Sequence, residues 1–109
     1  MITLATLANS TKQEVFEQVK QHLLAQNKRA INDRNTCQYK IGELKCAAGC
    51  LISDDEYTPE FENNSWRVLQ YRNLVPETHS RLIQQLQKIH DRHQPKDWPR
   101  LLNELEKTI

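Results

Sequence analysis

The chain has 109 residues, and its 15 basic and 14 acidic side chains leave a formal net charge of +1. This length is typical of one domain, residues 1–109, and the low net charge excludes a general nucleic-acid binder, which needs a strongly basic surface. No apolar run approaches the 18 residues of a membrane span, and ten Gln and eight Asn contribute to a mean hydropathy of −0.78. We therefore expect a thin core under a large polar surface.

The first predicted element is a helix over residues 11–27. Its first residues, Thr-Lys-Gln-Glu at 11–14, fit a capping box, in which the Thr hydroxyl and the Glu carboxylate satisfy each other's free backbone N–H groups. The arm before this helix, residues 1–9, is expected to pack on the body or on a partner. Within the helix, apolar residues recur at helical spacing and form one stripe: Val15, Phe16, Val19, Leu23 and Leu24.

Residues 37–45 predict a short β-hairpin, because polar and apolar residues alternate there and Gly42 permits a turn. Two strands this short cannot stand alone, so helices must cover one face of the hairpin. Residues 46–52, Cys-Ala-Ala-Gly-Cys-Leu-Ile, place small residues before large ones. This order predicts a short buried helix whose small face lets another backbone approach closely.

Three further helices are predicted in the C-terminal half. A cap at Ser65 begins a short helix, Pro76 opens a long amphipathic helix over residues 76–93, and a last helix follows the break at Pro95. The short link predicts that the last two are antiparallel. The fold class is therefore mainly α, a small compact helical domain with a short β-hairpin near 37–45. Ile109 is expected to face inward, and the predicted core comprises Val15, Phe16, Val19, Leu23, Ile41, Cys46, Cys50, Leu51, Leu82, Ile83, Leu86, Ile89, Trp98, Leu101, Leu102 and Leu105.

The three cysteines, Cys37, Cys46 and Cys50, are the first candidates for chemistry. Three thiolates and one histidine would make a tetrahedral zinc site, and a disulfide is more feasible between Cys37 and Cys46 than between Cys46 and Cys50. The spacing lacks the C-x2-C pairs of zinc fingers, and free cysteine is among the most buried residue types, so structural packing is the favoured interpretation. An odd number of cysteines without a convincing signal peptide predicts a reduced, cytoplasmic setting.

The histidines offer a second candidate site on the predicted long helix. His90 and His93 lie three residues apart, but a two-histidine metal site also needs a carboxylate, and Asp91 between them is predicted to point elsewhere. We therefore expect these histidines to pack at the edge of the apolar face with their polar tips in water. Catalysis by Cys46 or Cys50 would need the fold to bring a histidine such as His90 to the thiol.

An acidic cluster follows the cysteines and comprises Asp54, Asp55, Glu56, Glu60 and Glu62. It could hold Ca²⁺ or Mg²⁺ or meet a basic partner, but its spacing does not match the EF-hand pattern. The favoured interpretation is helix capping and a solvated face, because acidic residues stabilise helix N-termini. Basic residues between 28 and 45 are expected to neutralise the cluster within the fold. If a partner binds here, the predicted interaction residues are Asp54, Asp55, Glu56, Tyr57 and Glu60.

Residues 37–57 carry an aromatic-basic hairpin followed by a Lys-Cys-Ala-x-Gly-Cys-Leu-Ile-x-Asp stretch with a Tyr soon after. The pattern resembles a widespread, uncharacterised family of small bacterial and phage proteins, from which the chain departs at Glu43, where the hairpin glycine is expected, and at Ser53, where proline is expected. The resemblance implies an accessory protein of a mobile gene cassette or phage in a bacterial cytoplasm, and it implies no particular activity. The residues that match are Cys37, Tyr39, Lys40, Leu44, Lys45, Cys46, Ala47, Gly49, Cys50, Leu51, Ile52, Asp54 and Tyr57.

No catalytic or cofactor motif is present. The sequence lacks a nucleophile elbow, a P-loop and a dinucleotide-binding glycine pattern, and its two glycines make a phosphate-cradling loop hard to build. We therefore predict no cofactor and no catalytic residue, and favour a non-enzymatic binding or protein-interaction module. Its partner would be another protein or a second copy, as a homodimer, with no membrane and no nucleic acid. The alternative is a zinc or redox thiol site built on Cys37, Cys46 and Cys50.

Overall fold

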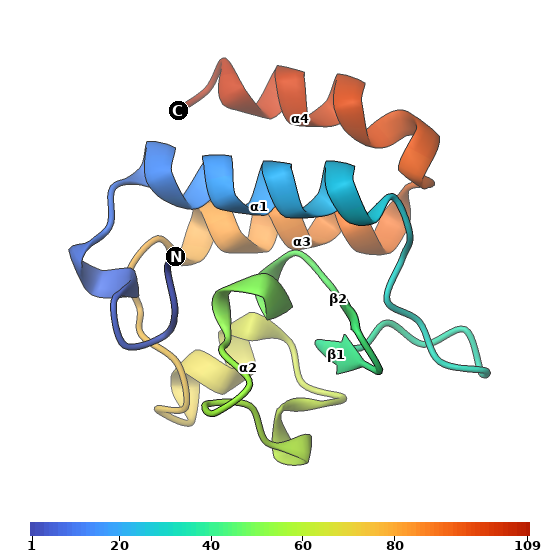
Figure 1. The fold of residues 1–109 in the computed structure, drawn as a ribbon. Coiled ribbons are helices and arrows are strands. Elements are labelled where there is room, and N and C mark those ends of the chain that lie inside the picture. Colours follow the sequence, from blue (N-terminus) through green and yellow to red (C-terminus); the bar gives the residue numbers. More distant parts are fainter.

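The structure, a computed structural model, describes all residues from Met1 to Ile109. Three helices form most of its body: α1 (Lys12–Gln26), α3 (Ser80–Arg92) and α4 (Trp98–Glu106). Each of these helices packs on the other two, and Figure 1 shows α4 running opposite to α3, which confirms the predicted antiparallel pair. A short helix, α2 (Trp66–Tyr71), and one two-stranded hairpin complete the fold. The mainly α prediction is therefore confirmed.

The ends of α1 follow from its own residues. The Thr11 hydroxyl accepts a hydrogen bond from the N–H of Glu14 at 3.1 Å, and the Glu14 carboxylate accepts from the N–H of Thr11 at 2.8 Å. Asn27 ends the helix with a φ of 49° and donates its N–H to the carbonyl of Leu23. Asn tolerates this left-handed conformation, which stops helical hydrogen bonding. Both ends agree with the predicted span of 11–27.

The hairpin pairs β1 (Lys40–Ile41) with β2 (Leu44–Lys45) in antiparallel register. Gly42 makes the turn with a φ of 58°, a left-handed value that favours glycine. Before the hairpin, Ile31 and Cys37 form an isolated antiparallel bridge. The predicted hairpin of residues 37–45 is thus present, with its regular part confined to four residues.

After the hairpin, the chain enters a 3-10 turn, η2 (Ala48–Leu51), so the regular part of the helix predicted for 46–52 is shorter and tighter than expected. The expectation of a close backbone approach is confirmed at Gly49. A Cβ atom added there would lie 2.0 Å from the carbonyl oxygen of Tyr39, the residue just before β1. Only glycine therefore lets the segment before β1 pack directly on η2.

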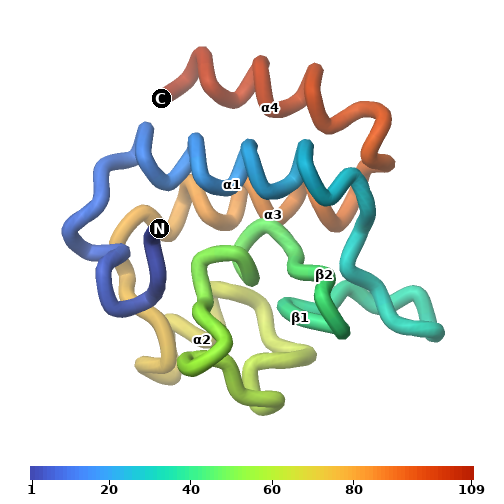
Figure 2. Tube along the Cα trace, viewed as in Figure 1, coloured from blue at the N-terminus to red at the C-terminus, as the bar shows by residue number.

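The remaining short elements connect the body to the hairpin half, and Figure 2 traces their path. α2 begins at the predicted cap, where the Ser65 hydroxyl accepts from the N–H of Val68 at 3.2 Å. Three further 3-10 turns occur at η1 (Leu7–Asn9), η3 (Pro59–Phe61) and η4 (Pro95–Asp97). The last of these leads directly into α4.

The predicted start of α3 at residue 76 is wrong, because the helix begins at Ser80. His79 takes a left-handed φ of 61°, which does not occur inside an α-helix, and its Nε2 contacts the carbonyl oxygen of Ser10. This contact joins the turn before α3 to the turn before α1. A contact between residues so far apart in sequence sets the helix start, and Pro76 lies outside it.

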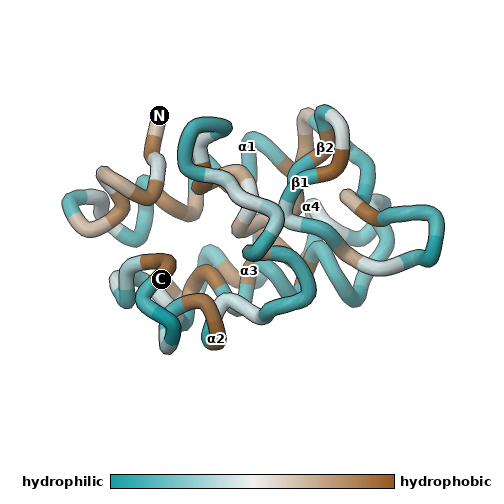
Figure 3. The backbone as a smooth tube through the Cα atoms, turned by 90° about the horizontal axis from the view of Figure 1, so that it is seen from below, coloured by the Kyte–Doolittle hydropathy of each residue, from teal (hydrophilic) through white to brown (hydrophobic).

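Twelve of the sixteen predicted core residues are buried, and eleven further residues join them. Ile109, predicted to face inward, is 41% exposed because it lies beyond the end of α4. Figure 3 shows hydrophobic residues as short stretches in a mainly hydrophilic trace, as expected for a thin core. No helix has the length and apolar character needed to cross a membrane. Four predicted core residues are only partly buried, namely Ile41, Cys50, Leu101 and Leu105, whereas the core gains Leu7, Ala30, Tyr39, Ala47, Ala48, Ile52, Phe61, Trp66, Leu69, Val75 and His90.

Candidate functional site

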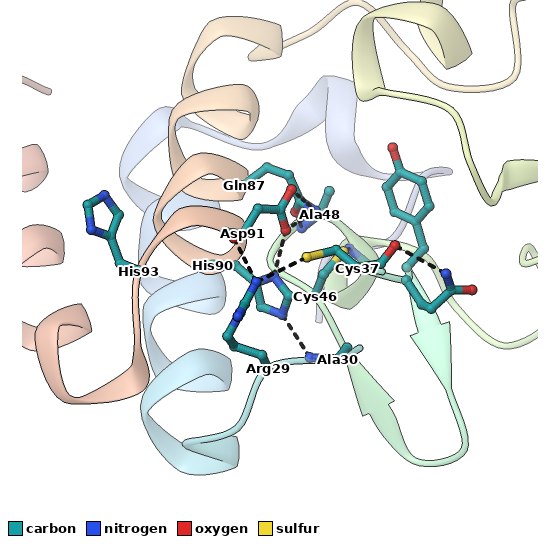
Figure 4. A network of polar contacts seen from close by, with 12 residues as sticks. Arg29, Ala30, Cys37, Cys46, Ala48, Gln87, His90, Asp91 and His93 are labelled. Carbon is teal, nitrogen blue, oxygen red and sulfur yellow. Dashed lines mark hydrogen bonds and ion pairs between the residues drawn. The ribbon is translucent and has the colours of Figure 1, made fainter. Parts of the chain in front are cut away.

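His90, near the end of α3, is fully buried, although its imidazole side chain is polar. Its ring stacks on Trp98 with centroids 5.7 Å apart, so the prediction that its tip lies in water is wrong. The N–H of Ala30 donates to Nε2 at 2.9 Å, and Nδ1 lies 2.7 Å from the Asp91 carboxylate (Figure 4). Because Nε2 accepts a hydrogen bond, the ring hydrogen must be on Nδ1, which donates to Asp91.

Asp91 faces the same place, contrary to the prediction that it points elsewhere. Its carboxylate oxygens accept from the Gln87 amide at 3.2 and 3.4 Å. The Gln87 side-chain oxygen in turn accepts from the N–H of Ala48 at 2.9 Å, which ties α3 to η2. His93, the predicted partner of His90, is exposed and points away in Figure 4. The structure therefore joins His90 to Asp91 and not to His93.

Cys37 lies next to His90 and Asp91, beside the Arg29 side chain. The Arg29 guanidinium donates to the Cys37 sulfur at 3.6 Å and to the backbone carbonyl of Asp91 at 2.7 Å. Burial raises the pKa of Cys37, and the neighbouring Asp91 carboxylate adds to this effect, against a smaller lowering by Arg29. The sulfur is therefore a protonated thiol near neutral pH, which is a weak nucleophile. We call these residues the polar cluster: Arg29, Cys37, Gln87, His90 and Asp91.

The polar cluster contains metal-ligating residue types, but its hydrogen bonds do not fit a metal ion. One ligand atom each from Cys37, His90 and Asp91 lie within 4.8 Å of one another. A metal ion on Nδ1 of His90 would move the ring hydrogen to Nε2, where the N–H of Ala30 already points. The Arg29 guanidinium beside the sulfur would also repel a cation. These residues therefore satisfy one another as they stand.

The other two cysteines do not join this group, and all three are free thiols. Cys46 is buried, and its sulfur accepts from the N–H of Gly49 at 3.2 Å. Cys50 donates its thiol to the carbonyl of Ala47 at 3.1 Å. Burial raises the pKa of both thiols, that of Cys50 to about 12. The three predicted sulfur ligands are thus not gathered into one ligand set, and each has its own local hydrogen bond.

Glu56, one of the predicted interaction residues, holds the N-terminal arm. Its carboxylate accepts from the N–H groups of Leu4 at 3.0 Å and Ala5 at 2.9 Å, and from that of Ser53 at 3.0 Å. Desolvation opposes ionisation here, but these N–H groups outweigh it and lower the pKa of Glu56. The carboxylate therefore stabilises the fold in its charged form.

Most of the other acidic residues also bond within the chain. Asp54 forms ion pairs with Lys40 at 3.0 Å and with Lys45 at 3.2 Å. These two pairs are the internal neutralisation that the sequence predicts. Glu60 lies 3.9 Å from Arg72, and Glu62 accepts a hydrogen bond from the Tyr57 hydroxyl at 2.6 Å. Among the predicted carboxylates, only Asp55 has neither an ion pair nor a side-chain hydrogen bond.

A groove of about 350 Å³ opens beside the polar cluster. It lies between α3 and two segments from elsewhere in the chain, residues 37–39 and 63–66. Cys37 and Asp91 line it, so the polar cluster forms part of its wall. The rest of the lining is mainly amide and cationic, and includes Gln38, Asn63, Gln84, Lys88 and Arg92.

Several polar groups of this groove have no partner in the chain. Lys88 and Arg92 are exposed and form no ion pair. Gln84 donates its amide nitrogen to the Ser80 hydroxyl at 2.9 Å, which leaves its oxygen free. The indole N–H of Trp66, which is buried at the groove, has no acceptor. The groove therefore holds unused hydrogen-bonding capacity.

Sequence reasoning missed Arg29, Gln87 and the groove itself. One usable signal exists for His90, because it falls on the same helical face as Ile83, Leu86 and other apolar residues of α3, which predicts burial. Arg29 and Gln87 carry no comparable signal, since their partners lie in other segments.

No protein-family model matches the sequence, and no curated protein and no solved structure shows a significant match to it. The function must therefore be argued from the geometry of the polar cluster and the groove.

Proposed function

We propose that the protein is a non-enzymatic binding module whose binding site is the groove beside α3. The main support is a contrast between two neighbouring groups of side chains. In the polar cluster, both His90 nitrogens and both Asp91 carboxylate oxygens are bonded within the chain. In the groove, the Lys88 and Arg92 side chains have no partner in the chain. Unpaired polar groups that converge on a concave surface are available to a ligand.

Catalysis by the polar cluster has little support from its geometry. A cysteine nucleophile needs a base that can take its proton. Nε2 of His90 accepts from Ala30 and Nδ1 already carries the hydrogen, so neither nitrogen is free for this role. The raised pKa of Cys37 also keeps its sulfur protonated. Binding therefore explains the arrangement better than thiol or metal chemistry does.

Self-association, a role in mobile DNA and a cytoplasmic location stay predictions of the sequence. The large exposed apolar side chains lie mostly on separate segments, and only Val68 and Tyr71 share one helix. A homodimer would therefore bury little apolar area at any one place. Sedimentation at high protein concentration tests this point: a dimer mass would support self-association, and a monomer mass would count against it.

Backbone amide NMR spectra test the proposal. The protein is titrated with three capped pentapeptides of acidic, neutral and basic composition. We expect at least one of them to shift the amide signals of Gln38, Asn64, Gln84 and Lys88, which belong to different segments but line one groove. Signals from the far end of α4, such as Glu104, serve as the internal control. Spectra without groove shifts for any peptide would contradict the proposal.

A further inference from the structure

Cationic residues form a stripe along the exposed face of α3. Arg81, Lys88 and Arg92 are spaced at i, i+7 and i+11, which places them on one helical face, with Gln85 between them. All three cations are exposed, and none has an ion-pair partner in the chain. The groove includes Lys88 and Arg92, and a second depression continues along α3 from Lys88 past Gln84 to Arg81. The cationic stripe is therefore complementary to an anionic ligand.

The spacing of these cations fits an extended polypeptide. At 1.5 Å per helical residue, Lys88 and Arg92 lie about 6 Å apart along the axis, and Arg81 and Arg92 about 17 Å apart. Alternate residues of an extended chain are about 6.6 Å apart, and the first and last of five residues are about 13 Å apart. Two carboxylates at alternate positions would therefore meet Lys88 and Arg92, and the segment would cover most of the length of the stripe.

Amide side chains face the stripe across the groove. The Gln38 side-chain nitrogen donates a hydrogen bond to the Cys37 carbonyl at 3.2 Å, and the Gln38 side-chain oxygen is free. The Asn63 side chain makes no hydrogen bond within the chain, and Gln84 presents its free oxygen from α3. An amide supplies both a donor and an acceptor, which is what the alternating N–H and C=O groups of an extended peptide need.

Other anionic occupants fit this groove less well. Single-stranded nucleic acid needs exposed aromatic rings for stacking, whereas Tyr39 and Trp66 at the groove are only 6% and 2% exposed. A free phosphate or small dicarboxylate would meet the two cations but leave the facing amides unused. A second copy of this chain is a poor source, because only Asp55 of its acidic cluster lacks an internal partner, and one carboxylate cannot meet both cations.

We propose that the groove binds an acidic peptide segment of a partner protein. The segment is extended, about five residues long, and carries two carboxylates at alternate positions that pair with Lys88 and Arg92. Asp91 in the groove wall brings one negative charge against the two positive charges of Lys88 and Arg92, so the groove keeps a positive balance. This assignment rests on the groove being the binding site and adds the chemistry of its ligand.

Calorimetric titration with capped peptides tests the assignment. The probe is Gly-Glu-Gly-Glu-Gly, and Gly-Gln-Gly-Gln-Gly is its uncharged match. Removing two exposed ion pairs is worth about two- to thirtyfold in Kd, so we expect Lys88→Gln/Arg92→Gln to weaken binding about fivefold. The control Lys28→Gln/Lys107→Gln makes the same charge change at exposed residues outside the groove and should stay within about twofold. Raising the salt concentration should weaken binding of the acidic peptide.

The outcomes separate this assignment from the proposed function. Equal binding of the neutral peptide in the groove, unchanged by Lys88→Gln/Arg92→Gln, would leave the binding module intact and overturn the acidic preference. Tighter groove binding of inorganic phosphate, glutarate or a thymidine pentanucleotide would replace the peptide with that ligand. If no probe perturbs the groove amides, both the assignment and the proposed function are wrong. Amide spectra of both double variants show whether they fold as the parent does.

Discussion

Replacing Gly49 with alanine should strongly destabilise the fold. The added Cβ would lie 2.0 Å from the Tyr39 carbonyl oxygen and 3.0 Å from its carbonyl carbon. Real Cβ contacts are rarely closer than 3.4 Å, so the two backbones must separate by roughly an ångström. This separation is opposed on the Tyr39 side, because its N–H donates to Glu62 at 2.9 Å and its hydroxyl to the Asn64 carbonyl at 2.7 Å.

Overpacking a core typically costs about 1–3 kcal/mol. Because the clashing atom at Gly49 belongs to a fixed backbone, we expect the upper end, about 3 kcal/mol of unfolding free energy. For a domain of this size, that loss lowers Tm by about 12 °C. Urea unfolding followed by circular dichroism measures the free energy directly.

Gly42→Ala is the matched control for Gly49→Ala. Nothing lies within 4 Å of a Cβ at Gly42, but its φ of 58° is strained for alanine. We expect a cost of about 1 kcal/mol from the backbone conformation alone. A Gly49→Ala variant no less stable than Gly42→Ala would refute the close packing of Tyr39 on η2.

Three further predictions concern the polar cluster and the arm. His90→Leu leaves the buried N–H of Ala30 without an acceptor and should lower the unfolding free energy by about 2 kcal/mol in urea titrations. The lowered pKa of Glu56 means that its stabilising effect is present above pH 4.5 and is lost as the pH falls through the lowered value. Glu56→Gln should therefore cost about 1 kcal/mol at pH 7, and the difference from the parent should shrink as the pH is lowered from 5 to 2. Because the pKa of Cys37 is raised, its alkylation by iodoacetamide should be slower at pH 8 than that of the unfolded chain, and the rate should keep rising above pH 9. Equal alkylation rates for folded and unfolded protein would contradict the raised pKa of Cys37.

Sequence signals predict the elements whose ends are set by neighbouring residues. The capping box of residues 11–14, the Ser65 cap and the turn at Gly42 are all local, and each lies where the pattern places it. The start of α3 is not local, because His79 is held outside the helix by a contact to Ser10. The missed core residues have a similar cause. Phe61, for example, ends a 3-10 turn of three residues, which is too short to show a helical period.

The candidate site could be predicted only in fragments. The sequence correctly predicts that small residues in the cysteine-rich segment let another backbone approach closely, which occurs at Gly49. The polar cluster, however, combines residues 29–30 and 37 with the last turns of α3, and the groove adds residues 63–66. No sequence window contains these segments together. The unpaired cations of α3 are visible in the sequence, but their lack of partners follows only from the packed structure.

The separate roles of the polar cluster and the groove depend on the position of one hydrogen atom, that on Nδ1 of His90. Long-range ¹H–¹⁵N correlation spectra of the His90 ring at pH 7 locate this hydrogen, with and without one equivalent of Zn²⁺. We expect the Nδ1–H form, unchanged by zinc, because the N–H of Ala30 occupies Nε2. An Nε2–H form, or a ring signal that shifts when zinc is added, would contradict a closed structural cluster and restore metal chemistry at Cys37.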